Sequence, residues 1–165
     1  MRALIPALVA LASPLAAQEG PVANGSTIGN WVVQCEAVTV SETACRVQQS
    51  LSVAETGQMI ATFVAVPRPG GAAVLVAQVP IGAHLPSGAV YRPDGVEGAE
   101  QVEMIWQRCL GPICEAAVEI SAAELAGFTE AGAILFGYRM RADSDPIIVP
   151  VSVARLQEAL AAISG

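Results

Sequence analysis

The sequence predicts an all-β protein, a single-domain antiparallel β-sandwich or barrel-like domain with one or two short helices, including a C-terminal helix. Three observations lead to this prediction. Short apolar or alternating runs recur along the chain, and glycine- and proline-rich turns separate them about every ten residues. Helical periodicity is confined to two short segments in the last third of the chain. The four cysteines fall into two local pairs, as expected where a disulfide joins neighbouring strands.

The N-terminus has the pattern of a secretory signal peptide. A positive charge at Arg2 precedes an apolar stretch that runs through Leu15, and small residues follow up to Ala17. We assign residues 1–17 to the signal peptide, residues 18–27 to a polar, flexible leader and residues 28–165 to the β domain. The apolar stretch is too short to span a bilayer comfortably, and no second one follows. We therefore expect an exported protein, periplasmic or associated with the outer envelope, without an integral membrane segment after cleavage.

The first half of the domain predicts four strands. The first is expected over residues 31–35 and the second within residues 44–57. Residues 59–67 and 72–81 are strongly apolar and are divided by Arg-Pro-Gly-Gly, which is a turn signal. We expect these two runs to form a central hairpin that is buried on both faces.

A short strand is expected next at residues 89–91, between two clusters of turn-forming residues. Residues 102–109 and 114–120 flank the tetrapeptide Leu-Gly-Pro-Ile and predict another hairpin. Ser121 and the glutamate three residues later have capping-box spacing, so one or two helical turns are expected over residues 122–128.

The C-terminal part predicts two strands and the final helix. The strands are expected over residues 133–142 and 147–151, with Asp-Ser-Asp-Pro as the turn between them. Ser152 is placed to cap a helix over residues 153–163. The apolar stripe of this helix comprises Val153, Leu156, Leu160 and Ile163, with Arg155 and Glu158 outside it. We expect the stripe to pack on the core of the domain itself, although it could also dock on a partner.

The four cysteines can be interpreted as disulfides, as zinc ligands or as a redox dithiol. Four cysteines allow three pairings, and we favour the local ones, Cys35 with Cys45 and Cys109 with Cys114, because an exported chain meets an oxidising compartment. A zinc site would prefer closer cysteine spacing or histidine partners. A redox dithiol usually has two intervening residues at a helix N-terminus, whereas Cys114 leads into a strand-like run. Two structural disulfides are therefore the favoured interpretation.

Composition and charge exclude several classes of function. The chain is 53% hydrophobic and 14% charged, which excludes disorder over most of its length. The net charge is −7, and an acidic surface repels phosphate backbones, so nucleic-acid binding is not expected. Trp31 and Trp106 each lie close to a cysteine and are expected in the core.

No catalytic residue, metal site or cofactor is predicted. His84 is the sole histidine, and nothing in the sequence places a nucleophile within its reach, so we expect a solvent-facing loop residue. Glu97, Glu100 and Glu103 form a spaced acidic group, but no calcium-loop pattern surrounds them. We expect these carboxylates to lie on a solvated loop and strand face.

Several segments together resemble the invasion-associated locus B family of exported alphaproteobacterial proteins. They are the Trp31-x-x-x-Cys35 opening, Cys45 followed by Gln48, the segment QVPIGAHLPSGAVYRPDG, the paired Cys109 and Cys114, and the closing segment PIIVPVSVARLQEAL. The chain departs from the family pattern at Ile113, where a glycine is usual, and in the closing segment at residues 152–156. The resemblance implies an all-β exported domain with disulfides, linked in some pathogens to entry into host cells, and implies no catalytic residues.

These features predict a non-enzymatic envelope protein that binds another protein, either of the envelope or of a host. The alternative is a small-molecule or lipid carrier, in which the apolar strands line a cavity. A weaker alternative is a thiol oxidoreductase that uses Cys109 and Cys114. A ligand cavity in the structure favours the carrier, whereas an exposed apolar patch or a long unpaired edge strand favours protein binding.

Overall fold

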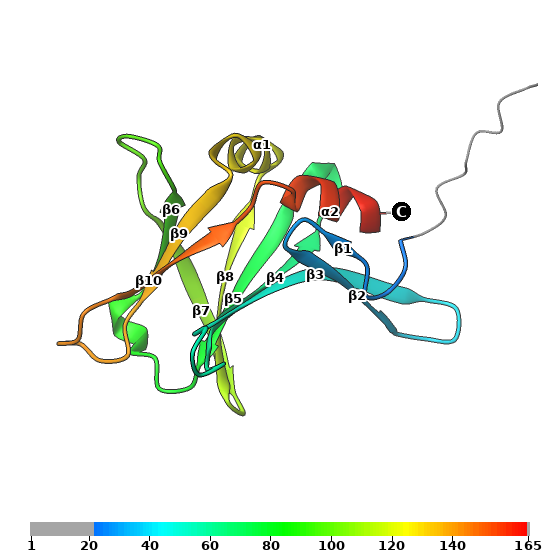
Figure 1. The fold of residues 1–165 in the computed structure, drawn as a ribbon. Helices are drawn as coiled ribbons and strands as arrows, with labels where there is room; N and C mark the ends of the chain where they lie inside the picture. The colour runs from blue at the N-terminus through cyan, green and yellow to red at the C-terminus, as the bar shows by residue number, and fades with distance from the viewer. Residues whose placement is uncertain (1–21, 165) are drawn as a thin grey trace, which may run out of the picture.

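The computed structural model describes residues 22–164. The predicted signal peptide, residues 1–17, lies outside the described residues. Within them the chain forms ten strands and two α-helices (Figure 1). The strands are β1 (Thr27–Ile28), β2 (Trp31–Ala37), β3 (Thr43–Ser52), β4 (Met59–Pro67), β5 (Ala73–Pro80), β6 (Ala89–Pro93), β7 (Val102–Leu110), β8 (Ile113–Ile120), β9 (Ala133–Tyr138) and β10 (Ile147–Ser152). The helices are α1 (Ala122–Ala131) and α2 (Leu156–Ile163).

All ten strands belong to one antiparallel sheet, which curls into a half-barrel (Figure 1). Their order is β1-β2-β3-β4-β5-β8-β7-β6-β9-β10. This confirms the all-β, antiparallel, barrel-like prediction, including the C-terminal helix. Most neighbours in the sheet are also neighbours in sequence, because tight turns join them.

The sheet changes partner along β7. The first residues of β7 pair with β6, from Val102 opposite Tyr91 to Met104 opposite Ala89. From Ile105 onward β7 pairs with β8 instead, and the register shifts between Trp106 and Arg108. A β-bulge of this kind bends its strand and increases the local twist. The bulge in β7 therefore lies where the β6-β9-β10 part of the sheet turns away from the rest.

The core fills the inside of the curl. The rings of Phe63 on β4 and Phe136 on β9 meet edge to face, with centroids 5.0 Å apart. The Tyr138 hydroxyl on β9 donates a hydrogen bond to the Ile60 carbonyl on β4 at 2.9 Å. Trp31 is fully buried, as predicted, whereas Trp106 is only partly buried against the core. Contacts between strands that are far apart in sequence thus stabilise the curved sheet.

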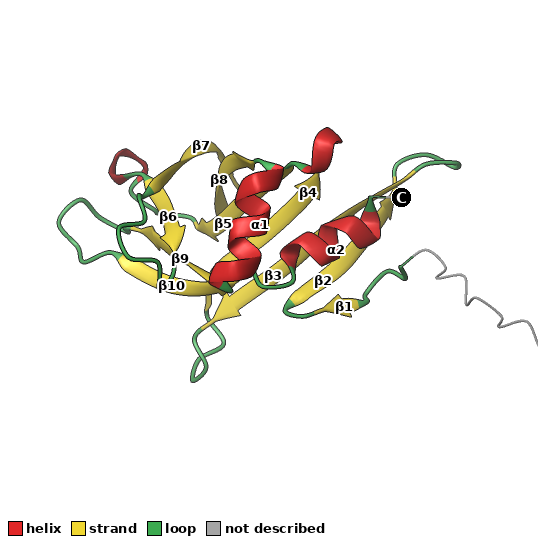
Figure 2. Cartoon of the chain, turned by 90° about the horizontal axis from the view of Figure 1, so that it is seen from above, coloured by secondary structure: helices red, strands yellow, loops and turns green. Residues whose placement is uncertain are grey.

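Both helices lie on the same side of the sheet (Figure 2). Helix α1 begins with the predicted capping box at Ser121 and extends to Ala131, one turn beyond the predicted end. It ends at Gly132, whose φ of 74° is a left-handed conformation that favours glycine.

Helix α2 is shorter than predicted. It begins at Leu156, and Ser152 is the last residue of β10 rather than a helix cap. The backbone amides of Val153 and Ala154 both donate to the Gly132 carbonyl, which keeps this segment beside the end of β9 and delays the helix. The predicted stripe packs inward on the core, as expected.

A further prediction differs from the structure in detail. The apolar hairpin is buried on both faces only in the middle of β4, since alternate residues of β5 are merely half-buried. The reason is that both helices cover the same face of the sheet.

The described part of the predicted leader lies beside β2. The Gly25 amide donates a hydrogen bond to the Val33 carbonyl and the Val33 amide donates one to the Ser26 carbonyl, each at 2.8 Å.

Candidate binding surfaces

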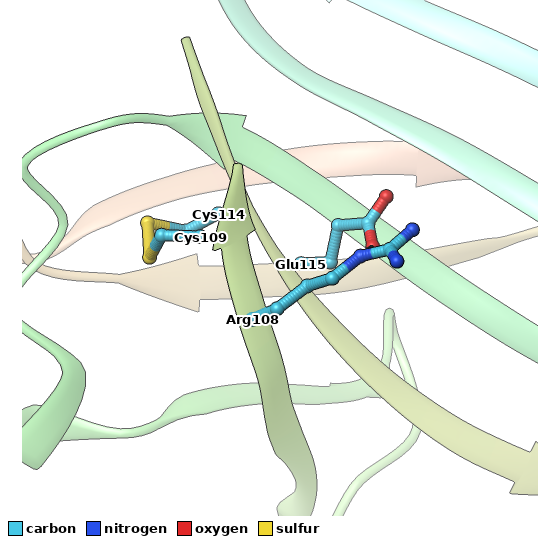
Figure 3. Close-up of a disulfide and its surroundings, with 4 residues drawn as sticks. All are labelled: Arg108, Cys109, Cys114 and Glu115. Atoms are coloured by element: carbon cyan, nitrogen blue, oxygen red, sulfur yellow. Dashed lines mark hydrogen bonds and ion pairs between the residues drawn. A yellow bond between two sulfur atoms is a disulfide. The ribbon is translucent and has the colours of Figure 1, made fainter. Parts of the chain in front are cut away.

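Both cysteine pairs are disulfides between directly opposed strand positions. The structure joins Cys35 on β2 to Cys45 on β3, and Cys109 on β7 to Cys114 on β8. The second pair closes the turn at Gly111, whose φ of 57° explains the glycine there. Alternate residues of a strand face opposite sides, so the disulfide lies on one side of this hairpin and Arg108 lies on the other (Figure 3).

The surroundings of the cysteines favour a structural role. Each pair lies within strands, away from the helix N-terminus that lowers thiol pKa values in redox dithiols. Cys114 is almost completely buried, whereas Cys109 is exposed at the tip of the hairpin. Within residues 22–164 there is no free cysteine and no group of three or more metal-ligating side chains.

The sole histidine lies in the loop between β5 and β6 and is half-buried. Its Nδ1 atom lies 2.8 Å from the Ser87 hydroxyl, a local contact that sequence reasoning did not find. A catalytic pair of this kind needs a third group that orients the ring. No carboxylate of the described residues hydrogen-bonds to His84. Glu97, Glu100 and Glu103 are all exposed, as predicted for a solvated acidic face.

Neither helix covers the opposite face of the sheet, whose side chains range from buried Val64 and Thr62 to exposed Ile105. Residues that are directly opposed across antiparallel strands point to the same face, so the register defines rows of side chains. We call two adjacent rows the open sheet face. The apolar row is Val32, Gln48, Val64, Val76, Ala117 and Ile105. The polar row is Ser50, Thr62, Gln78, Glu115 and Arg108.

Hydrogen bonds between strands organise the polar row. The Ser50 and Thr62 hydroxyl oxygens are 3.0 Å apart. The Gln78 amide nitrogen donates to Glu115 Oε1 at 2.9 Å, and Arg108 Nε donates to Glu115 Oε2 at 2.7 Å. Burial raises the pKa of Glu115, but these two hydrogen bonds and the charge of Arg108 outweigh it and hold the pKa below its ordinary value. Glu115 is therefore ionised and fully paired at neutral pH.

The open sheet face carries little net charge although the protein is acidic. Its only charged residues, Arg108 and Glu115, neutralise each other. Beside it, Arg46 pairs with Glu36 at 2.6 Å. The cores of protein interfaces are depleted of unpaired charge in the same way. Ile105, with 69% of its surface exposed, is the most prominent apolar side chain of the face.

A cavity of about 390 Å³ lies between helix α1 and the β6–β7 hairpin. Helix α1 contributes Glu124, Gly127, Phe128 and Ala131, which share one helix face because they are spaced by three or four residues. Glu130 lies at the rim on the last turn. The other side is formed by Tyr91, Pro93, Val96 and Val102. The sequence analysis did not find this cavity, since only the fold brings its two sides together.

Tyr91 forms the wall of the cavity with Phe128. Their rings meet edge to face with centroids 5.7 Å apart, and Tyr91 is 2% exposed. Burial, and then the negative charge of Glu124, raise the pKa of the Tyr91 hydroxyl to about 12. The phenol is therefore neutral at physiological pH.

Comparison with known proteins decides the family. The family model described as "Invasion associated locus B (IalB) protein" matches residues 31–164. The chain belongs to the invasion-associated locus B family. The sequence resemblance noted above is thereby confirmed. The match includes all four cysteines, the open sheet face and the cavity beside α1.

A solved structure shows the same fold in a family protein. The crystal structure of invasion associated protein b from Bartonella henselae matches with a TM-score of 0.70 at 14% sequence identity. The match covers 84% of this chain and 92% of that one. No curated protein sequence matches the chain. Within residues 22–164 of this family member, neither helix is long and apolar enough to span a bilayer.

Proposed function

We propose that this protein is exported to the periplasm or outer envelope and acts there, without catalysis, by binding another protein. The signal-peptide pattern at residues 1–17 and the two disulfides support export. The invasion-associated name of the family supports a partner that is either an envelope protein or a host protein.

The observation that carries the proposal is the open sheet face. It spans strands β2, β3, β4, β5, β8 and β7, and both helices lie on the opposite side of the sheet (Figure 2). A row that is apolar except at Gln48, beside charges that are paired with each other, is the composition expected at the centre of a protein contact. The hydrogen-bonded polar row holds the face rigid, which lowers the entropy that would be lost on binding.

The edges of the sheet are less suited to adding a partner strand. Strand β1 at one edge has two residues. Strand β10 at the other edge contains Pro150, which lacks the amide proton that strand pairing needs. Short or interrupted edges are typical of sheets that avoid edge pairing. The face therefore supports binding better than the edges do.

The test compares two exposed isoleucines on strands. Ile105 belongs to the open sheet face, and Ile148 is on β10, outside this face, with 59% of its surface exposed. The mature oxidised protein and the variants Ile105→Glu and Ile148→Glu are used for affinity capture from envelope extracts, and bound proteins are identified by mass spectrometry. We expect one protein to be captured by the wild type and by Ile148→Glu, and lost with Ile105→Glu. Capture of the same protein by all three forms contradicts the role of the open sheet face, and capture of none by the wild type contradicts an envelope partner.

A small-molecule or lipid carrier is the second candidate function. The cavity beside α1 favours it, because its volume of about 390 Å³ is within the range of ligand sites and most of its lining is apolar. Extraction and mass spectrometry of molecules that copurify with the protein test this function. A bound lipid or metabolite, without a captured protein, favours the carrier.

A further inference from the structure

The cavity beside α1 combines an apolar interior with an acidic rim. Phe128, Val96, Val102 and Pro93 supply apolar surface, and Gly127 and Ala131 leave space because their side chains are small or absent. The charged lining residues are Glu124 and Glu130, and none of the lining residues is basic.

The position of Glu124 is fixed by the capping box. Its Oε2 atom accepts hydrogen bonds from the Ser121 amide at 2.8 Å and from the Ser121 hydroxyl at 2.6 Å. Oε1 takes part in no hydrogen bond with another described residue. Glu130 lies in the last turn of α1, where the helix dipole adds negative potential. The rim therefore attracts a positive charge.

Tyr91 supplies a second, independent observation. Its side chain is almost completely buried and lines the cavity, yet its hydroxyl hydrogen-bonds to no other residue within 22–164. The hydroxyl oxygen itself is not sealed from solvent, so a water molecule or a ligand can hydrogen-bond to it. A neutral phenol oxygen can accept a hydrogen bond from an ammonium group.

We propose that this cavity binds a small organic ammonium ion whose apolar body lies between Phe128 and the β6–β7 hairpin and whose charged nitrogen faces Glu124 and the Tyr91 hydroxyl, while Glu130 adds negative potential from the last turn of α1. This proposal rests on the carrier function and specifies its class of ligand. It does not depend on binding at the open sheet face. An anion of the same shape is repelled by the two carboxylates, and a neutral molecule lacks the attraction.

The charge preference is tested with three molecules of nearly equal shape: phenethylamine, phenethyl alcohol and hydrocinnamate. Each is titrated into the mature oxidised protein while amide NMR shifts are followed. We expect shifts around Gly127 and Ala131, with the amine bound about 3- to 5-fold more tightly than the alcohol for each carboxylate that it meets. Hydrocinnamate should bind weakest. Equal affinity for the amine and the alcohol, or no binding of the amine, overturns the assignment.

The location is tested with Gly127→Leu and the matched control Ala126→Leu. A Cβ atom on Gly127 meets no protein atom within 4 Å, so a leucine there can begin without a clash and takes up space in the cavity that Gly127 lines. Ala126 is exposed on α1 and does not line the cavity. Gly127→Leu raises helix propensity, and Ala126→Leu lowers it only slightly. We expect Gly127→Leu to abolish amine binding and Ala126→Leu to retain it; unchanged binding to Gly127→Leu refutes this location.

The role of the rim is tested with Glu130→Gln, which leaves the capping box intact. We expect amine affinity to fall by about 2-fold, through the loss of a charge that acts over a distance, and alcohol affinity to stay the same. An equal change for both molecules contradicts the role assigned to the carboxylate.

Discussion

Breaking the second disulfide should destabilise the protein by an amount that depends on which cysteine is replaced. Cys109 and Cys114 are five positions apart in sequence. The chain-entropy model gives roughly 2 kcal/mol for closing so short a loop in the unfolded chain. The variant Cys109→Ala removes little else, because Cys109 is exposed at the hairpin tip. We therefore expect it to lose about 2 kcal/mol of unfolding free energy.

Replacement of the buried partner should cost more. Cys114 is 1% exposed, so Cys114→Ala also removes a buried sulfur atom from the core. Deletion of one buried heavy atom costs about 0.5–1.5 kcal/mol, and the total loss should be about 3 kcal/mol. The first disulfide closes a loop of ten positions, for which the same model gives roughly 2.7 kcal/mol.

Urea unfolding followed by circular dichroism measures these differences. The exposed thiol left by Cys114→Ala is blocked with iodoacetamide, whereas the buried thiol left by Cys109→Ala is kept free, because alkylation would overpack the core. A stability of Cys109→Ala within about 0.5 kcal/mol of the wild type would refute the entropic account, because the cross-link would then add little to a hairpin that is already closed. The unreduced wild type provides a control for the oxidoreductase alternative. Rapid labelling of Cys109 or Cys114 before reduction would support that alternative and would contradict a purely structural disulfide.

Three other variants probe the packing, the helix cap and the open sheet face. Phe136→Ala removes the edge-to-face contact with Phe63 and should cost about 3–5 kcal/mol in urea unfolding. Ser121→Ala removes the capping box and should cost about 1 kcal/mol, measured in the same way. Glu115 has a lowered pKa in the folded state, so its contribution to stability is present above its unfolded pKa of about 4.3 and is lost as the pH falls through the folded value. The stability advantage of the wild type over Glu115→Gln should therefore shrink below about pH 4, and an advantage that does not change with pH contradicts the pairing with Arg108.

Local sequence patterns predicted the individual elements well. Turn signals separated the strands, and the capping-box spacing at Ser121 located the start of α1. The prediction failed at Ser152 because a residue suited to a helix cap can equally end a strand. The choice depends on the hydrogen bonds that Gly132 accepts from Val153 and Ala154, and no local pattern contains them.

The candidate surfaces depended on long-range register. Ile105 and Val64 lie in separate strands, β7 and β4, and only the pairing of β4 with β5, of β5 with β8 and of β8 with β7 aligns them in one row. The spacing of Glu124, Gly127 and Phe128 indicates a shared helix face. Their meeting with Tyr91 depends on how β6 lies against α1.

Some determinants of the fold act over a few residues only, namely strand and turn propensity, cysteine spacing and helix capping. The amino-acid sequence alone was therefore enough to define an all-β domain with hairpins cross-linked by disulfides. The direction in which the sheet curls depends on contacts between residues far apart in the chain, such as the hydrogen bond from Tyr138 to the Ile60 carbonyl. That curl determines which face the helices cover and which stays open. The tertiary structure therefore decided which surfaces are candidates for binding, because a surface exists only after distant strands have come together.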